Sequence, residues 1–241
     1  MRTLVVLPTF NERENIEEVL QRVRASVPEA EVLVVDDASP DGTADAAEAT
    51  AAELGRIGVI RRGGKGGLGS AYRHGFAHGM EAGFEIMVEM DSDLSHDPAA
   101  LPALLAAVEQ GADLSIGSRY VPGGAIPDWR WHRRLLSRWG NRYASVVLGL
   151  AVRDATSGYR AYRSEMLQRI DLASVHADGY AFQIEMAYRV VGEQGRVVEV
   201  PISFVDRIRG TSKMSGRIVV EALGLVSWWG LRDRILRRKK R

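Results

Sequence analysis

The chain has 241 residues, of which 46% are hydrophobic and 26% charged, and its formal net charge is +1. This length allows one sizeable core, while the balanced charge argues against a disordered chain and against a basic nucleic-acid-binding domain. Cysteine is absent, which excludes disulfide bonds and thiolate metal ligands and fits a reducing compartment, with the cytoplasm as the default.

Strand-like and helix-like segments alternate through the first half of the chain. The expected strands are Thr3–Leu7, Glu31–Val35, Ile57–Ile60, Glu85–Met90 and Asp113–Gly117. The expected helices are Asn15–Ser26, Thr43–Leu54, Leu68–Ala82 and Pro98–Gln110. Repeated βα units predict an α/β fold with a mainly parallel central sheet flanked by helices and joined by right-handed crossovers.

The helix at Pro98–Gln110 carries a signal at each end. Asp97 is expected as its N-cap and Pro98 as its first residue, since proline suits that position. Gly111 is expected to end the helix, because glycine enters the left-handed region without strain.

The second half of the chain has a less regular pattern. It contains a loop at Val121–Pro127 and expected helices at Arg133–Leu148 and Ala181–Val191. We expect one compact domain over residues 1–213, followed by an amphipathic, basic helix and tail over residues 214–241.

The C-terminal segment joins an apolar helix to a basic tail. Ile218–Leu231 is predicted to be helical, but Glu221 interrupts it and it falls short of the roughly 20 residues that span a bilayer. Seven of the last ten residues are lysine or arginine. Two interpretations stay open: Leu225, Trp228 and Trp229 face a membrane while the tail meets anionic headgroups, or the helix packs on the core.

The glycine-rich segment Gly63–Gly69 contains the G-x-G-x-x-G spacing of dinucleotide-binding folds. That fingerprint normally follows the first strand of its βαβ unit, whereas these glycines follow the third expected strand. The spacing therefore argues only weakly for a nicotinamide enzyme.

Polar and acidic side chains follow three of the expected strands where each ends. Pro8–Glu12 follows the first strand, Asp36–Thr43 the second and Asp91–Asp93 the fourth. Ligands of open α/β sheets bind outside the carboxyl ends of the strands. Carboxylates there can accept hydrogen bonds from a nucleoside and hold Mg²⁺ or Mn²⁺ against a diphosphate. For Asp41 and Thr43, a role in shaping the turn and helix start stays open.

Seven short segments extend this pattern over nearly the whole chain. They are Val5–Glu12, Val35–Thr43, Gly67–Gly69, Asp91–His96, Gly117–Tyr120, Thr156–Arg160 and Gly210–Lys213. In this order they resemble the family 2 glycosyltransferases of the GT-A fold, and within them the polyprenyl-phosphate (dolichyl-phosphate) mannose synthases. The resemblance implies a Rossmann-like fold that binds a nucleotide-diphospho-sugar.

The resemblance also implies which residues bind the donor and the metal. The residues implied to line the guanosine site are Pro8, Phe10, Glu12, Val35 and Asp37. Asp91 and Ser92 are implied to lie near the diphosphate, and Asp91, Asp93 and Ser95 to form the metal site. Two positions depart from the family pattern, because Phe10 stands where tyrosine is frequent and Ser95 where some relatives carry glutamine.

Three basic residues, Arg119, Arg207 and Lys213, match family positions around the donor and acceptor phosphates. Together with Asp91 and Asp93 they are the expected catalytic residues. Guanidinium and ammonium groups offset the repulsion between a nucleotide diphosphate and a lipid phosphate. The alternative for the arginines is an ion pair with Asp206 or Asp154.

The implied reaction is an inverting, metal-dependent transfer of mannose from GDP-mannose to a polyprenyl phosphate, giving polyprenyl phosphate β-mannose and GDP. A phosphate acceptor is already an anion at neutral pH, so no general base is expected. Two alternatives are a transferase that uses UDP-glucose or another sugar nucleotide, and a non-catalytic or NAD-binding α/β domain.

A lipid acceptor implies a peripheral position at the cytoplasmic face of a membrane, with a small membrane protein as a further candidate partner. The segment Trp129–Arg134 contains two tryptophans and four basic residues that can face the headgroups. Burial of both tryptophans in the core is the alternative.

Overall fold

The computed structural model describes residues 1–206 and 216–239, with the side chains of its last helix described from residue 219 to 233. The strands are β1 (Thr3–Thr9), β2 (Glu31–Asp36), β3 (Ile57–Arg61), β4 (Ile86–Glu89), β5 (Leu114–Ser118), β6 (Arg160–Arg163) and β7 (Val197–Pro201). The α-helices are α1 (Ile16–Ser26), α2 (Thr43–Leu54), α3 (Leu68–Glu81), α4 (Leu101–Glu109), α5 (Trp131–Leu148), α6 (Ser164–Arg169), α7 (Gly179–Gly192) and α8 (Gly216–Lys239). Two 3₁₀ turns, η1 (Pro98–Ala100) and η2 (Leu172–Ser174), complete the set.

All strands and helices expected in the first half are present, each within two residues of its expected bounds, except that α4 begins at Leu101 because the expected first turn from Pro98 is the 3₁₀ turn η1. The signals around α4 are confirmed. The Asp97 carboxylate accepts a hydrogen bond from the backbone N–H of Ala99 at 3.0 Å, and Gly111 has a φ of +96°.

The strands form one seven-stranded sheet in the order β3-β2-β1-β4-β6-β5-β7. All neighbours run parallel except β6, which is antiparallel to both β4 and β5. The expected mainly parallel sheet is therefore confirmed. Sequence analysis missed β6, α6 and β7, since β6 begins and ends with arginine and lacks the apolar pattern of a central strand.

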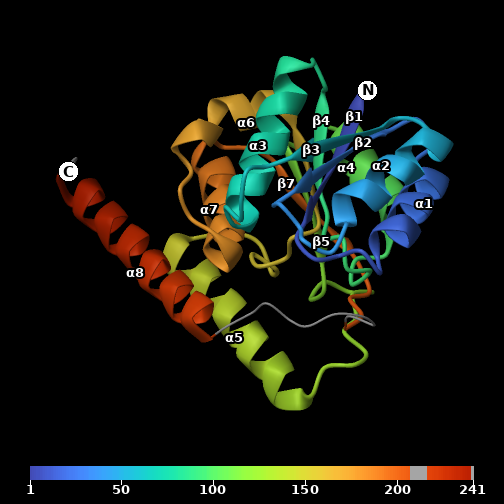
Figure 1. Cartoon of the computed structure of the whole chain (residues 1–241). Coiled ribbons are helices and arrows are strands. Elements are labelled where there is room, and N and C mark those ends of the chain that lie inside the picture. The colour runs from blue at the N-terminus through green and yellow to red at the C-terminus, as the bar shows by residue number, and fades with distance from the viewer. Residues whose placement is uncertain (207–215, 240–241) are drawn as a thin grey trace.

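The sheet separates two apolar clusters. Along β1, Val5 and Leu7 face the cluster beneath α1, α2 and α4, whereas Leu4 and Val6 face the cluster beneath α3 and α7. This alternation is the period of two that a strand imposes. Figure 1 shows the helices on the two sides of the sheet, with α5 and α8 together at one end of the molecule.

One side of α8 packs on the rest of the molecule. Ala222 and Val226 are buried, and Trp229, only 8% exposed, stacks on Tyr188 of α7. Trp228 is 60% exposed. Trp229 therefore packs on the core, as one of the two open interpretations has it, whereas Trp228 lies at the surface, where it can face a membrane. Within the described ranges, no helix is long and apolar enough to cross a membrane.

The two tryptophans around the start of α5 also differ in their exposure. Trp129 is 6% exposed, and its indole N–H donates a hydrogen bond to Asp206 at 2.8 Å. Trp131 is 76% exposed. Of the two open interpretations, burial in the core therefore holds for Trp129, and exposure at the surface holds for Trp131.

Helix α3 approaches the sheet closely at two glycines. A Cβ at Gly75 would lie 2.5 Å from Cγ1 of Val6, and one at Gly79 would lie 2.6 Å from the sulfur of Met87. Both distances are too short for a methyl group. The glycines therefore set the distance between α3 and the sheet, and with it the position of the loop before α3.

We expect Gly75→Ala to lower the free energy of unfolding by about 1–3 kcal/mol, because its methyl group overpacks the contact with Val6. Gly224→Ala on α8 is the matched control, since a Cβ there meets nothing within 4 Å. The control should raise stability by roughly 0.5–1 kcal/mol through helix propensity. Urea unfolding of both variants checks this, and equal effects at the two sites would contradict it.

Candidate active site

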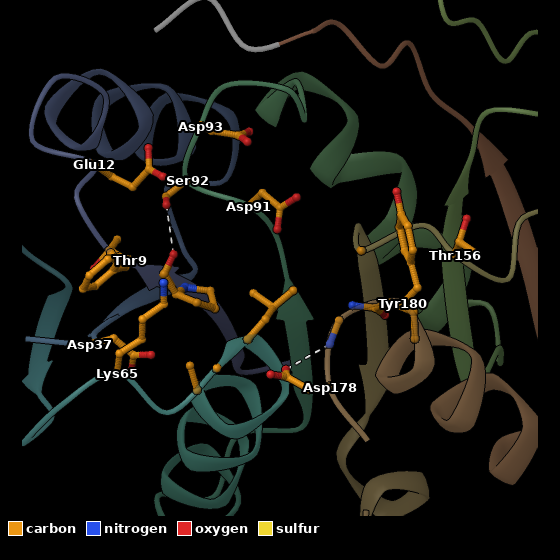
Figure 2. A pocket seen from close by; sticks show the side chains of 18 of the residues that line it. Thr9, Glu12, Asp37, Lys65, Asp91, Ser92, Asp93, Thr156, Asp178 and Tyr180 are labelled. Carbon is orange, nitrogen blue, oxygen red and sulfur yellow. Dashed lines mark hydrogen bonds between the residues drawn. The ribbon is translucent and has the colours of Figure 1, made fainter. Parts of the chain in front are cut away.

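A cavity of about 470 Å³ lies at the carboxyl ends of β1, β2 and β4. Its walls come from the segments that follow these strands, from the start of α3, from residues 156–158 and from the start of α7. The lining residues are Pro8, Thr9, Phe10, Glu12, Asp37, Lys65, Gly67, Leu68, Ala71, Asp91, Ser92, Asp93, Thr156, Gly158, Asp178, Gly179, Tyr180, Gln183 and Glu221. Figure 2 shows Asp37 and Lys65 on one side of the cavity, Thr156 and Tyr180 on the other, and Asp91 between them.

One side of the cavity is built around Asp37. Its carboxylate forms an ion pair with Arg62 at 2.5 Å and accepts a hydrogen bond from the backbone N–H of Gly66 at 3.0 Å. Asp37 thereby holds the glycine-rich loop against the end of β2. The same loop carries Lys65, whose ammonium lies 4.2 Å from the centre of the Phe10 ring. Sequence analysis named neither Arg62 nor Lys65, although a lysine among glycines is a usable signal for a phosphate site.

The loop after β1 is tied to the start of α2. The backbone N–H of Glu12 donates to Oγ1 of Thr43 at 3.0 Å, and Asp41 accepts hydrogen bonds from Thr43 and from the backbone N–H of Arg13. Burial alone would raise the pKa of Asp41, but these hydrogen bonds lower it overall. Asp41 and Thr43 therefore shape this turn, and Glu12 lines the cavity with a side chain that is 7% exposed.

The centre of the cavity is acidic. The Asp91 side chain is 31% exposed, and its carboxylate lies 3.8 Å from Nδ1 of His96. Asp93 accepts a hydrogen bond from the backbone N–H of Ser95 at 2.9 Å, and the hydroxyl of Ser92 donates to the carbonyl of Pro8 at 2.9 Å. These contacts fix the segment after β4 against the end of β1.

Asp91 and Asp93 suit a divalent cation. In the portion of the chain that the structure describes, no group of three or more acidic, histidine or cysteine side chains is arranged to hold a metal by itself. Mg²⁺ commonly binds through one or two carboxylates plus substrate phosphates, and these two side chains fit that donor set. A metal here would depend on the diphosphate for its remaining ligands.

Three predicted site residues lie off the cavity. Val35 is fully buried, and its side chain packs beneath Gly75 of α3 and does not line the cavity. Ser95 is 2% exposed and orients Asp93 through its backbone N–H, while its side chain does not reach the cavity. Arg119 is likewise absent from the cavity wall.

Two further predicted residues, Arg207 and Lys213, lie outside the described residues. The boundary proposed between residues 213 and 214 also falls there.

Arg119 forms a buried ion pair with Asp154. Its Nε and Nη2 each donate to the carboxylate at 2.7 Å, and the two side chains are 5% and 0% exposed. Burial alone would raise the pKa of Asp154, but the charge and hydrogen bonds of Arg119 outweigh it and hold that pKa below its ordinary value. The alternative of an ion pair with Asp154 is thus confirmed, although the pair is buried. Arg119 is linked to the cavity wall through Thr156, to which its Nη2 donates at 2.9 Å.

A second cavity, of about 140 Å³, adjoins the first. It lies between α5 and α8 and is lined mainly by apolar and aromatic side chains, among them Trp139, Tyr143, Ile184, Ala222 and Val226. Thr156 and Tyr180 line both cavities. A polar cavity and an apolar groove therefore meet at these two side chains.

A buried polar cluster supports the far side of the main cavity. Arg160 is fully buried and donates to the carbonyls of Ser157, Ala155 and Gln183 at 2.7 Å each. Its Nε lies 3.5 Å from the carboxylate of Glu89. Burial raises the pKa of Glu89 to about 8, although the charge of Arg160 opposes that shift.

Comparison with known proteins gives one family. Residues 4–171 match the model of glycosyl transferase family 2. The chain is 49% identical to the polyprenol monophosphomannose synthase of Mycolicibacterium smegmatis, over 97% of this chain and 89% of that protein. It is 51% identical to the undecaprenyl-phosphate mannosyltransferase of Micrococcus luteus, over 97% of this chain and 96% of that protein.

Among solved structures, the glucosyl-3-phosphoglycerate synthase of Mycobacterium tuberculosis superposes with a TM-score of 0.70 at 22% identity, covering 94% of this chain and 80% of that one. A second structure of that enzyme, with a TM-score of 0.64 at 23% identity, holds Mn²⁺ and uridine diphosphate and covers 95% of this chain and 77% of that one. These likenesses establish the GT-A fold.

Replacing Asp154 by asparagine leaves the buried Arg119 without its counter-charge, and we expect a loss of about 3–5 kcal/mol in unfolding free energy at pH 7. Because the folded-state pKa of Asp154 is depressed, its contribution is present above the unfolded value of about 3.9 and is lost as the pH falls through the folded-state pKa. In urea titrations, the difference between the wild-type chain and Asp154→Asn should shrink below about pH 4.

The control is Asp171→Asn, at an exposed position, which should change stability by less than about 0.5 kcal/mol. A difference between the wild-type chain and Asp154→Asn that stays constant with pH would contradict the assignment of this ion pair.

Proposed function

The chain belongs to glycosyl transferase family 2 and is a glycosyltransferase, and we propose that it transfers mannose from GDP-mannose to a polyprenyl phosphate with inversion at the anomeric carbon. The products are polyprenyl phosphate β-mannose and GDP. The observation that carries this proposal is the meeting of an acidic cavity and an apolar groove at Thr156 and Tyr180. A polar donor and an acceptor with an apolar chain need such a junction.

The donor is assigned to the acidic cavity. The nucleoside lies toward Phe10, Glu12 and Asp37, and its diphosphate lies toward Asp91 and Asp93. Mg²⁺ or Mn²⁺ held by these two carboxylates would neutralise charge on the departing diphosphate. The Mn²⁺ and nucleotide in the M. tuberculosis structural neighbour support this assignment.

Lys65 is the described cation best placed to contact the donor. It belongs to the cavity wall and comes from a glycine-rich loop, and its ammonium would move from the Phe10 ring to a phosphate of the donor. The charge of Arg119 is already balanced by Asp154. We therefore assign Arg119 a positioning role through Thr156, in place of direct contact with the donor.

The acceptor is assigned to the junction and the groove. Its phosphate attacks the anomeric carbon in line with the departing diphosphate, and its first prenyl units enter the groove between α5 and α8. The acceptor oxygen is already anionic near neutral pH, so the step needs no proton transfer. The residues of the site have to position two anions and offset their repulsion.

A lipid acceptor requires contact with a membrane, and α5 and α8 offer a surface for it. Their exposed apolar side chains, which we call the lipid face, are Trp131, Leu135, Leu136, Trp139 and Val146 on α5 and Val220, Trp228 and Leu231 on α8. The exposed arginines beside them are Arg130, Arg133, Arg138 and Arg142. Tryptophan and arginine together are typical of a helix at an anionic lipid interface. The groove that would receive the prenyl chain opens between the same two helices.

Transfer should be measured with labelled GDP-mannose and a short polyprenyl phosphate, in Mg²⁺ or Mn²⁺ and then in EDTA. We expect metal-dependent formation of mannolipid and a loss on the order of a hundredfold or more in Asp93→Asn. Asp171→Asn, at an exposed position outside the cavity wall, should keep full activity. Transfer in EDTA would contradict the proposed metal dependence, and transfer from UDP-glucose alone would contradict the assignment of GDP-mannose as the donor.

Vesicle binding tests the lipid face. In co-sedimentation with phosphatidylglycerol vesicles, Trp131→Ser combined with Trp228→Ser should bind about tenfold more weakly or worse, since each large apolar side chain contributes roughly 1.5–3 kcal/mol when fully buried. Leu54→Ser is the control, because Leu54 is also exposed but lies on α2. Unchanged binding by the double variant would overturn the lipid face. Self-association of the wild-type chain through these helices would assign the surface to a second copy instead.

A further inference from the structure

The side-chain amide of Gln183 is buried, and most of its hydrogen-bonding capacity is unused. Gln183 is 2% exposed, lies on α7 and forms part of the cavity wall. Within residues 1–206 and 216–239, neither Nε2 nor Oε1 has a hydrogen-bond partner of ordinary geometry. A long hydrogen bond from the amide opposes the rise in the pKa of the neighbouring Glu89, so an N–H of the amide faces that carboxylate while the amide oxygen has no partner among the described residues. Burying an unmatched amide destabilises a fold, and such a group at a cavity wall points to a ligand.

The position of Gln183 is fixed by its backbone. Its carbonyl accepts a hydrogen bond from Nη1 of Arg160 at 2.7 Å, and the same guanidinium binds the carbonyls of Ala155 and Ser157. This clamp joins α7 to the segment that precedes β6. The backbone of Gln183 is therefore fixed beside the cavity by groups that do not bind its side-chain amide.

Gly158 leaves a space in front of the amide. A Cβ at Gly158 would lie 3.3 Å from Nε2 of Gln183 and 3.9 Å from Oδ1 of Asp91. A side chain here would therefore enter the gap between the carboxylate and the amide. Because glycine stands at this position, that gap belongs to the cavity.

The gap lies where the transferred sugar is expected, given the donor position in the proposed function. If the nucleoside lies toward Asp37 and the diphosphate at Asp91, then the hexose continues past Asp91 toward Gly158 and Tyr180. Figure 2 shows this order, with Asp91 between Asp37 and Tyr180.

We propose that the Gln183 amide hydrogen-bonds hydroxyl groups of the transferred hexose in the gap beside Gly158, and that this contact selects the sugar. An amide offers two donor hydrogens and one acceptor oxygen, which match hydroxyls that both donate and accept. A rigid polar group discriminates well, because a sugar with a differently placed hydroxyl leaves the buried amide unmatched. The inference rests on the proposed function, since it assigns the sugar end of the same donor site.

The test replaces Gln183 by methionine, which keeps the volume and removes the hydrogen bonds. Calorimetry should give unchanged affinity for GDP but about tenfold weaker binding of GDP-mannose. The preference in kcat/KM for GDP-mannose over GDP-glucose should fall by a similar factor, because the two sugars differ in the configuration of one hydroxyl. The melting temperature should stay level or rise, since the variant removes an unmatched buried amide.

Two further variants separate recognition from packing. Gly158→Ala places a methyl group in the same gap and should also weaken GDP-mannose binding while leaving GDP affinity intact. Gln168→Met, at an exposed position on α6, is the matched control and should change nothing.

Unaltered sugar preference in an active Gln183→Met variant would overturn the inference. A joint loss of GDP affinity and melting temperature would also overturn it, in favour of a packing role. Failure of the wild-type chain to bind GDP or to transfer from either donor would instead overturn the proposed function, and the inference with it.

Discussion

The buried guanidinium of Arg160 is the group on which the second half of the site depends. It is fully inaccessible, and burying a cation is tolerable only if its hydrogen-bonding capacity is met. Arg160 meets this requirement by binding the carbonyls of Ala155, Ser157 and Gln183, which belong to the loop before β6 and to α7. These are the segments that carry Thr156, Gly158 and Tyr180. Because breaking these hydrogen bonds would leave a buried charge without partners, they keep the loop before β6 and α7 together on the side of the cavity opposite Asp37.

The two sides of the cavity are organised by different physical means. The nucleoside side follows from parallel βα units, because successive strands deliver their C-terminal loops to one edge of the sheet. The opposite side is held by two buried arginines, Arg160 bound to its three carbonyls beside Glu89, and Arg119 in an ion pair with Asp154. Since Asp154 already balances Arg119, that pair adds rigidity without adding net charge. In the proposed reaction between two anions, the positive charge would then come from the metal and from basic side chains such as Lys65.

Helices α5 and α8 connect the cavity to the surface proposed to contact a membrane. These helices pack on each other through close contacts, with the hydroxyls of Tyr143 and Ser227 at 2.7 Å. They carry the lipid face on their exposed sides and the apolar groove between them. A prenyl chain in the groove would thus run from the headgroup region to the junction at Thr156 and Tyr180. The lipid would not have to leave the membrane entirely to present its phosphate.

The sequence by itself determined the first half of the fold, the mainly parallel sheet and the family, because these rest on local periodicity and on contiguous motifs. It also placed Glu12, Asp37, Asp91 and Asp93 at one edge of the sheet, since strand ends follow from strand positions. Tertiary structure decided what distant segments do. Val35 faces α3 because of the register of β2, and Arg119 meets Asp154 only once residues 35 apart in the chain are folded together. The polar strand β6, the division of the tryptophans between core and surface, and the unmatched amide of Gln183 likewise depend on burial, which no local pattern encodes.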